Sequence, residues 1–189
     1  YTSNLTPKIL GMFSPSKNEN IKNSDKRISS TNIFSSNRLG LTDSLEGGQS
    51  FTIGIDYGLE DNSNNKINAS IGQIFRDVED KRLPIKSKMR NKSSDLVGDL
   101  GINLNDVFKL NYNFSADNNL DFVNYNKLET ELSINNFVTK FDFLEENNDI
   151  GNESYLETNI FFPFRKNKTL YYKTRRNRKT NWQTWRYKI

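Results

Sequence analysis

Alternating apolar and polar residues are the dominant pattern in the middle of this chain. In residues 51–59 every odd position is apolar and every even position is small or polar. After a polar stretch at 60–65, which is rich in Asp and Asn, the alternation resumes in residues 66–75. A period of two is typical of a strand between two different environments, and Asp and Asn favour turns. These segments therefore predict a β-hairpin.

The same alternation recurs along most of the remaining chain. It is found at residues 96–104, 107–115, 120–134 and 137–143, and we interpret residues 155–162 and 169–175 as a final hairpin. Short polar turns, such as Asn105-Asp106, alternate with longer polar loops, such as the charged stretch 76–94 that contains Pro84. The pattern predicts about eight strands in hairpin order and no helix. We expect an all-β, antiparallel, up-and-down sheet.

The length of 189 residues fits one domain or a part of one. Within it we expect mostly loop or irregular structure at 1–50, strand hairpins at 51–175, and a basic and aromatic tail or partial strand at 176–189. The chain begins with Tyr1 and shows no charged segment followed by an apolar one. We interpret it as a mature chain or an internal fragment of a larger protein.

The hydropathy of the chain excludes a helical membrane protein. The mean hydropathy is -0.79, and no apolar run approaches the roughly 20 residues that a spanning helix needs. Spanning strands need only about 9 to 11 residues with lipid-facing side chains at every second position. Charged residues at strand centres, Asp56, Asp99, Lys109, Glu129 and Glu131, suit a wet lumen. Aromatic residues gather near strand ends, as in interfacial girdles, which favours a transmembrane barrel over a soluble sheet.

The residue types narrow the chemistry further. The chain has no Cys and no His, which removes most redox, hydrolase and zinc chemistry. The acidic residues Asp77, Glu79 and Asp80 match no calcium-loop spacing. We interpret them, together with the adjacent Arg76, Lys81 and Arg82, as a solvated, salt-bridged loop. The sequence supports no catalytic, cofactor or metal site, and we expect that the protein is not an enzyme.

The C-terminal region combines basic and aromatic side chains. The residues are Lys173, Arg175, Arg176, Arg178 and Lys179, followed by Trp182, Trp185 and Tyr187. Nucleic-acid binding is one reading, since cations bind phosphates and aromatic rings stack on bases. A strand that leaves a membrane into anionic headgroups has the same composition, and Trp and Tyr are enriched there. We prefer the membrane reading and expect no nucleic-acid partner.

One stretch resembles a known family. Residues 32–44, followed by Glu46-Gly47-Gly48-Gln49 and the strand at 51–57, resemble the C-terminal barrel of the LPS-assembly protein family, LptD, also called organic solvent tolerance protein. The matching positions are Phe34, Asn37, Arg38, Asp43, Gly54 and Tyr57. Residues 69–76, which contain Gly72-Gln73, also resemble a strand of that family. Leu39, Gly40 and Ser44 depart from its pattern.

The resemblance implies a protein of the cell outer membrane that inserts lipopolysaccharide (LPS) into the outer leaflet. Its implied partners are LPS, the periplasmic bridge proteins that deliver it, a plug lipoprotein and outer-membrane lipids. Family barrels are very large, so about eight strands imply a segment of one. Another outer-membrane porin or receptor barrel, or a soluble β-sheet binding module, remains as an alternative.

The resemblance also implies structural roles for several residues. Asn37 and Arg38 are expected in a loop that enters the lumen and is held to the barrel wall by hydrogen bonds and charge. Phe34 and Asp43 belong to the same loop motif, whereas Gly54 and Gly72 are strand glycines. Simple turn chemistry is the alternative explanation for the loop residues.

Overall fold

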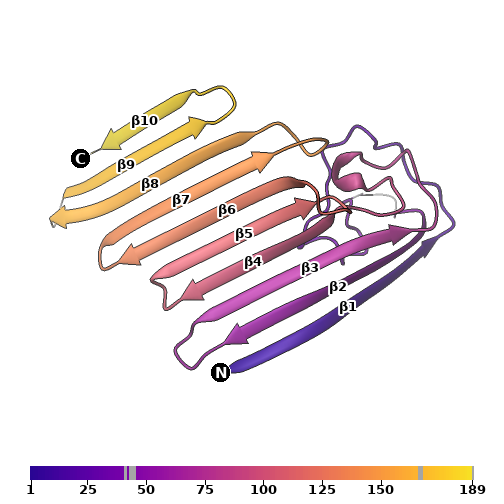
Figure 1. Ribbon diagram of the computed structural model, residues 1–189, viewed down its shortest axis with the longest axis horizontal. Coiled ribbons are helices and arrows are strands. Elements are labelled where there is room, and N and C mark those ends of the chain that lie inside the picture. Colours follow the sequence, from indigo (N-terminus) through magenta and orange to yellow (C-terminus); the bar gives the residue numbers. More distant parts are fainter. Residues whose placement is uncertain (41, 43–45, 166–167, 189) are drawn as a thin grey trace.

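The computed structural model describes residues 1–40, 42, 46–165 and 168–188, and these residues form a single antiparallel sheet (Figure 1). Its ten strands, counted over the described residues, are β1 (Thr2–Ser14), β2 (Gly48–Glu60), β3 (Lys66–Arg76), β4 (Leu96–Leu104), β5 (Phe108–Ala116), β6 (Val123–Ile134), β7 (Phe137–Glu146), β8 (Ser154–Arg165), β9 (Lys168–Asn177) and β10 (Gln183–Lys188). One 3-10 turn, η1 (Lys86–Lys88), lies between β3 and β4.

The strand order confirms the expected up-and-down topology. Each strand pairs with the next one in the sequence, and β1 and β10 form the two edges of the sheet. The sheet is open in the described part of the chain, which is consistent with a segment of a larger barrel. In that part, no helix is long and apolar enough to cross a membrane.

Strand β1 lies within residues 1–50, for which the sequence predicts mostly loop or irregular structure. Residues 2–14 are paired with β2 along their whole length, whereas residues 15–47 carry no strand where they are described. Pro7 lies opposite Ile55 within this pairing. Proline lacks the N–H that a central strand must donate, but an edge strand tolerates it.

Strand β10 gives the C-terminal segment a defined structure. Residues 183–188 pair with β9, with Trp185 opposite Thr174. Within residues 176–189, the strand spans Gln183–Lys188.

The connections differ between the two ends of the sheet (Figure 1). At one end, short turns join β2 to β3, β4 to β5 and β6 to β7. The expected turn at Asn105 and Asp106 is confirmed, and both residues adopt positive φ values, 48° and 56°. At the other end lie the long connections 15–47 and 77–95, which we call the first and the second long loop.

One face of the sheet is apolar across the strands. The register aligns Leu100 of β4 with Tyr112 of β5, and Tyr112 with Leu128 of β6. No second layer covers this face in the described part of the chain, so Ile9 is 71% exposed and Trp185 is 61% exposed. A continuous bare apolar surface of this kind indicates contact with a partner or a membrane.

The opposite face is polar and carries ion pairs between neighbouring strands. They include Lys140–Glu131 at 2.6 Å, Lys173–Glu157 at 2.6 Å and Lys8–Asp56. Each pair is partly exposed, so each contributes about 0–1 kcal/mol. The polar face therefore resembles a wetted surface, and the cluster of buried apolar residues on it is formed together with the long loops.

Candidate functional site: two long loops fastened to the polar face

The two long loops fold over the polar face of the sheet at one end of β2 and β3. They build a small hydrophobic core together with inward residues of the strands. Its buried members are Ile28, Ile33, Leu39, Ile74, Leu83, Met89 and Val97, and Ile21 and Phe34 pack against them. The core joins both loops to β3 and β4, so the loops are part of the fold.

Phe34 of the first long loop lies over the two strand glycines of the sequence motif. A Cβ atom at Gly54 would lie 2.6 Å from Phe34 Cζ, and one at Gly72 would lie 3.2 Å from Phe34 Cε2. Gly54 and Gly72 are also opposite each other in the register. The glycines thus leave the space that the ring occupies, and Lys8 Nζ lies 5.5 Å from the centre of the same ring.

Replacing Gly54 by Ala is expected to weaken the docking of the first long loop by about 1–3 kcal/mol, because overpacking displaces neighbouring groups. The new methyl group would meet Phe34 and also the Ile71 carbonyl oxygen, 2.5 Å away. The measurement is the rate of proteolytic cleavage within residues 15–47. Gly11→Ala is the matched control, since a Cβ there meets nothing within 4 Å. Equal cleavage of the two variants would contradict the close fit of Phe34.

Arg38 is the most extensively bonded residue of the motif. Its guanidinium donates to both carboxylate oxygens of Glu46, at 2.5 Å from Nε and 2.6 Å from Nη2. It also donates to Thr52 Oγ1 at 3.0 Å and Ser50 Oγ at 2.8 Å, both on β2. Arg76, at the end of β3, forms a second ion pair with Glu46. The first long loop is therefore attached to β2 through the Arg38 guanidinium and to β3 through the Glu46 carboxylate.

This ionic cluster is removed from solvent. The side chains of Arg38, Glu46 and Arg76 are 0%, 3% and 4% exposed. Burial lowers the pKa of Arg38 to about 10, so the guanidinium stays cationic at neutral pH. A buried carboxylate between two arginines is tolerated because its charge is neutralised and its lone pairs accept hydrogen bonds.

A second link joins the two long loops to each other. Asn18 Nδ2 donates to Asp80 Oδ2 at 2.9 Å and to the Gly47 carbonyl oxygen at 3.2 Å. Asp80 also accepts from Arg82, at 2.8 Å from Nε and 2.6 Å from Nη2. Hydrogen bonds from Arg82 first, and also from Asn18, hold the pKa of the Asp80 carboxyl well below its usual range.

Acid is expected to loosen this second link. Because the pKa of Asp80 is lowered in the folded protein, its contribution is complete above the ordinary value of 3.8 and is lost as the pH falls below it. At neutral pH, Asp80→Asn should cost about 1–2 kcal/mol. The readout is hydrogen exchange of the Ile21 amide, which donates to the Arg82 carbonyl oxygen at 2.9 Å, corrected for its intrinsic pH dependence.

The acid response should disappear in Asp80→Asn and persist in Asp77→Asn, a change at an exposed position of the same loop. An Ile21 amide with the same protection at pH 7 and pH 3 in the unmodified protein would contradict the assignment to Asp80.

The remaining motif residues have different positions. Asn37 is exposed in a turn, where its carbonyl oxygen accepts from the Gly40 amide at 3.0 Å. Asp43 lies outside the described residues. Phe34, Arg38, Gly54 and Gly72 are brought together by the first long loop and the two strands beneath it.

Sequence reasoning did not identify the partners that complete the cluster. Glu46 was part of the family-like stretch without an assigned role, and Arg76 was grouped with the solvated charges of the second long loop. The latter reading was wrong for Arg76, which is 8% exposed. It holds for Arg82 and Asp80, which form a partly exposed ion pair at 2.6 Å.

These features define a class of protein: a segment of an antiparallel outer-membrane β-barrel with long loops folded onto its inward, polar face. Residues 1–176 match the family model of LptD, described as LPS transport system D. The chain therefore belongs to the LptD family, whose members are outer-membrane proteins that act in LPS transport and assembly. The resemblance found in residues 32–76 is confirmed and extends over most of the chain. Comparison with curated protein sequences gave no match.

Proposed function

We propose that this chain forms part of the wall of a barrel that inserts LPS into the outer leaflet of the outer membrane. The observation that carries the proposal is the single-layer sheet with a bare apolar face on one side and an ion-paired polar face on the other. The apolar face suits lipid, and the polar face suits the saccharide part of LPS. In this mechanism the acyl chains move toward the membrane while the sugars pass through the lumen.

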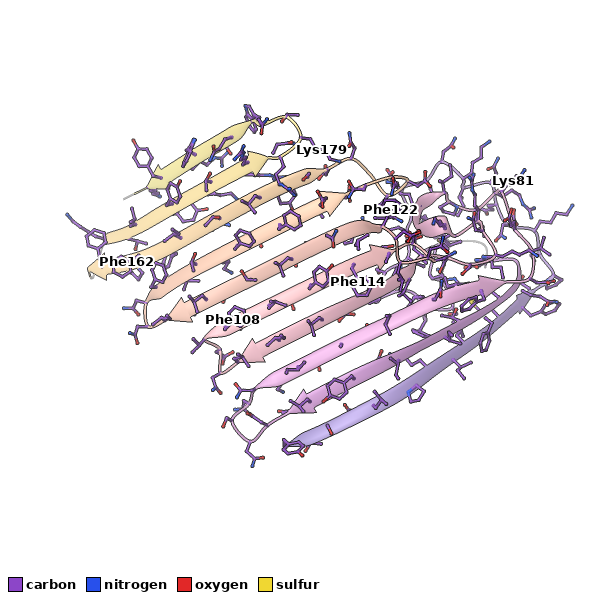
Figure 2. The ribbon with its side chains drawn as sticks, in the orientation of Figure 1. Lys81, Phe108, Phe114, Phe122, Phe162 and Lys179 are labelled. Atoms are coloured by element: carbon purple, nitrogen blue, oxygen red, sulfur yellow. The ribbon has the colours of Figure 1, made fainter. Side chains whose placement is uncertain are left out.

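The distribution of aromatic residues on the apolar face supports a membrane position. Near the short turns, the ring centres of Phe137 and Phe162 lie 6.1 Å apart, and Figure 2 shows Phe108 and Phe162 at this end of the sheet. Near the long loops, Phe51 of β2 lies opposite Phe75 of β3. Aromatic girdles at both membrane interfaces are typical of outer-membrane barrels.

The unequal connections support an orientation in the membrane. Outer-membrane barrels have short periplasmic turns and long extracellular loops. The short turns of this sheet would then face the periplasm, where bridge proteins deliver LPS. The long loops would lie at the cell surface, and a plug lipoprotein would occupy the lumen of the complete barrel.

The motif residues would act as anchors of the first long loop inside this lumen. Phe34 and Arg38 have the contacts for such a role, and Asn37 with Asp43 would complete the loop motif. The anchored loop would narrow the surface end of the lumen next to β2 and β3. No residue is assigned to chemistry on the lipid.

The test is depletion of the full protein that contains this chain in its own cells. LPS at the surface is labelled with a membrane-impermeant reagent and compared with total LPS. The proposal predicts a fall in the labelled fraction on depletion and its recovery with a plasmid copy. An unchanged labelled fraction, with the protein depleted from the outer membrane, would contradict it.

A further inference from the structure

A hollow on the polar face lies over the last three strands, away from the long loops described above. Its volume is about 380 Å³, within the range of small-ligand pockets. Glu157 of β8, Lys173 and Arg175 of β9, Thr184 and Arg186 of β10, and Trp182 of the connecting loop line it.

The charges around this hollow are not balanced. Lys173 is paired with Glu157 at 2.6 Å, and Glu157 is the only carboxylate among the lining residues. Arg175 lies 4.0 Å from the ring centre of Tyr155, and no described carboxylate lies within ion-pair distance of it. Arg186 makes no ion pair or hydrogen bond with any described residue. Three cations therefore face one carboxylate.

The charges are arranged differently on the strands that precede this region in the sequence. On β6 and β7 the polar face pairs its lysines with glutamates, as in Lys127–Glu129 at 2.8 Å and Lys140–Glu131 at 2.6 Å. On β9 and β10 the register instead places Lys173 directly opposite Arg186. Like charges directly opposite each other are destabilising, and an anion between them would remove the repulsion.

The rest of the lining suits a sugar. Trp182 is 64% exposed, so its indole ring offers a flat apolar surface to the C–H groups of a pyranose. Thr184 and Glu157 supply a hydroxyl and a carboxylate that bond sugar hydroxyl groups. The hollow opens on the face opposite to the lipid-facing residues Trp185 and Tyr172, which argues against a phospholipid headgroup.

We infer that this hollow over β8 to β10 binds a phosphorylated sugar, with Arg175 and Arg186 on the phosphate and Trp182 on the sugar ring. The inference rests on the proposed function, because it assigns part of the polar face to the anionic saccharide of the transported lipid. It goes further in naming a binding site and the residues that make it.

The test uses the full protein that contains this chain, purified in a non-ionic detergent. Glucose 6-phosphate is titrated as the probe, and binding is followed by saturation-transfer NMR. The double variant Arg175→Gln, Arg186→Gln should bind at least about tenfold more weakly, since two charge-assisted contacts are lost. Trp182→Ala should weaken the binding of glucose 6-phosphate more than it weakens the binding of inorganic phosphate. Heat-modifiable gel mobility verifies that each variant is folded.

Arg176→Gln is the matched control, because it removes the same charge from the neighbouring position on the opposite face of β9. Its affinity for the probe should equal that of the unmodified protein. The inference is overturned if the double variant binds like this control, or if glucose or glycerol 3-phosphate binds as tightly as glucose 6-phosphate. Either result would leave the surface-labelling test of LPS insertion unaffected, so the two failures are distinguishable.

Discussion

Replacing Glu46 by Ala is expected to weaken the attachment of the first long loop by about 3–5 kcal/mol. The change leaves Arg38 and Arg76 buried without a counter-ion, and a buried unpaired charge is costly. The effect corresponds to a loss of hydrogen-exchange protection of two to four orders of magnitude. The amide of Ile33, which donates to the Ser29 carbonyl oxygen at 3.0 Å, reports on this loop.

The matched control is Glu60→Ala at the far end of β2, the strand that follows the first long loop. Glu60 forms an ion pair with Lys66 at 3.1 Å, and both side chains are about half exposed, 51% and 47%. Its loss should cost no more than about 0.5 kcal/mol. If the Ile33 amide exchanged at the same rate in both variants, the ionic cluster would not be what holds the loop to the sheet.

Replacing Leu100 by Lys is expected to lower the free energy of unfolding in a lipid bilayer by about 2–4 kcal/mol. Leu100 lies at the centre of β4 on the apolar face, between Ala69 and Tyr112 of the neighbouring strands. If this face contacts lipid, the ammonium group is placed near the middle of the hydrocarbon layer. Denaturant unfolding of the full protein, folded into phospholipid vesicles, measures the cost.

The same substitution on the polar face is the control. Asn111 of β5 lies beside Gly101 and Glu129, so Asn111→Lys puts the new cation next to a carboxylate on the polar face. Its expected effect is within about 0.5 kcal/mol. A cost for Leu100→Lys no greater than that for Asn111→Lys would show that the apolar face does not contact lipid.

The strands from β2 to β9 are predictable because each carries its own signal. Apolar residues at every second position define the two faces without reference to any other part of the chain. The Asn105-Asp106 turn is equally local, since Asn and Asp adopt positive φ more readily than most residues. The observed strand ends differ from the predicted ones by a few residues. Strand β6, for example, begins at Val123 and not at Leu120, because Leu120 adopts a positive φ of 62° in the preceding turn.

Strand β1 was missed for a physical reason. Leu5, Ile9 and Phe13 lie on one face of β1 together with Pro7 and Gly11, which are residue types that central strands disfavour. Leu10 and Met12 lie on the other face, so the alternation of apolar and polar residues is incomplete. At the edge of a sheet neither Pro7 nor Gly11 prevents pairing, and whether a strand is at an edge depends on the whole topology. The residues of β1 alone therefore do not reveal that this segment is an edge strand.

The loop site was predictable only in part. The sequence motif identified Arg38, Gly54 and Gly72 as structural residues, but only the structure shows which residues they contact. The carboxylate that neutralises Arg38 is shared with Arg76, which belongs to a different strand. Such a pairing depends on the folded path of the first long loop, and neither composition nor periodicity reports it.

The central claim is that this chain forms part of a folded barrel in the outer membrane. Its most direct test is fractionation of cells that express the full protein, with gel mobility of the product compared before and after boiling. We expect a product in the outer-membrane fraction whose mobility changes on boiling, because a barrel resists detergent until it is heated. A product in the soluble fraction with the same mobility in both samples would contradict it.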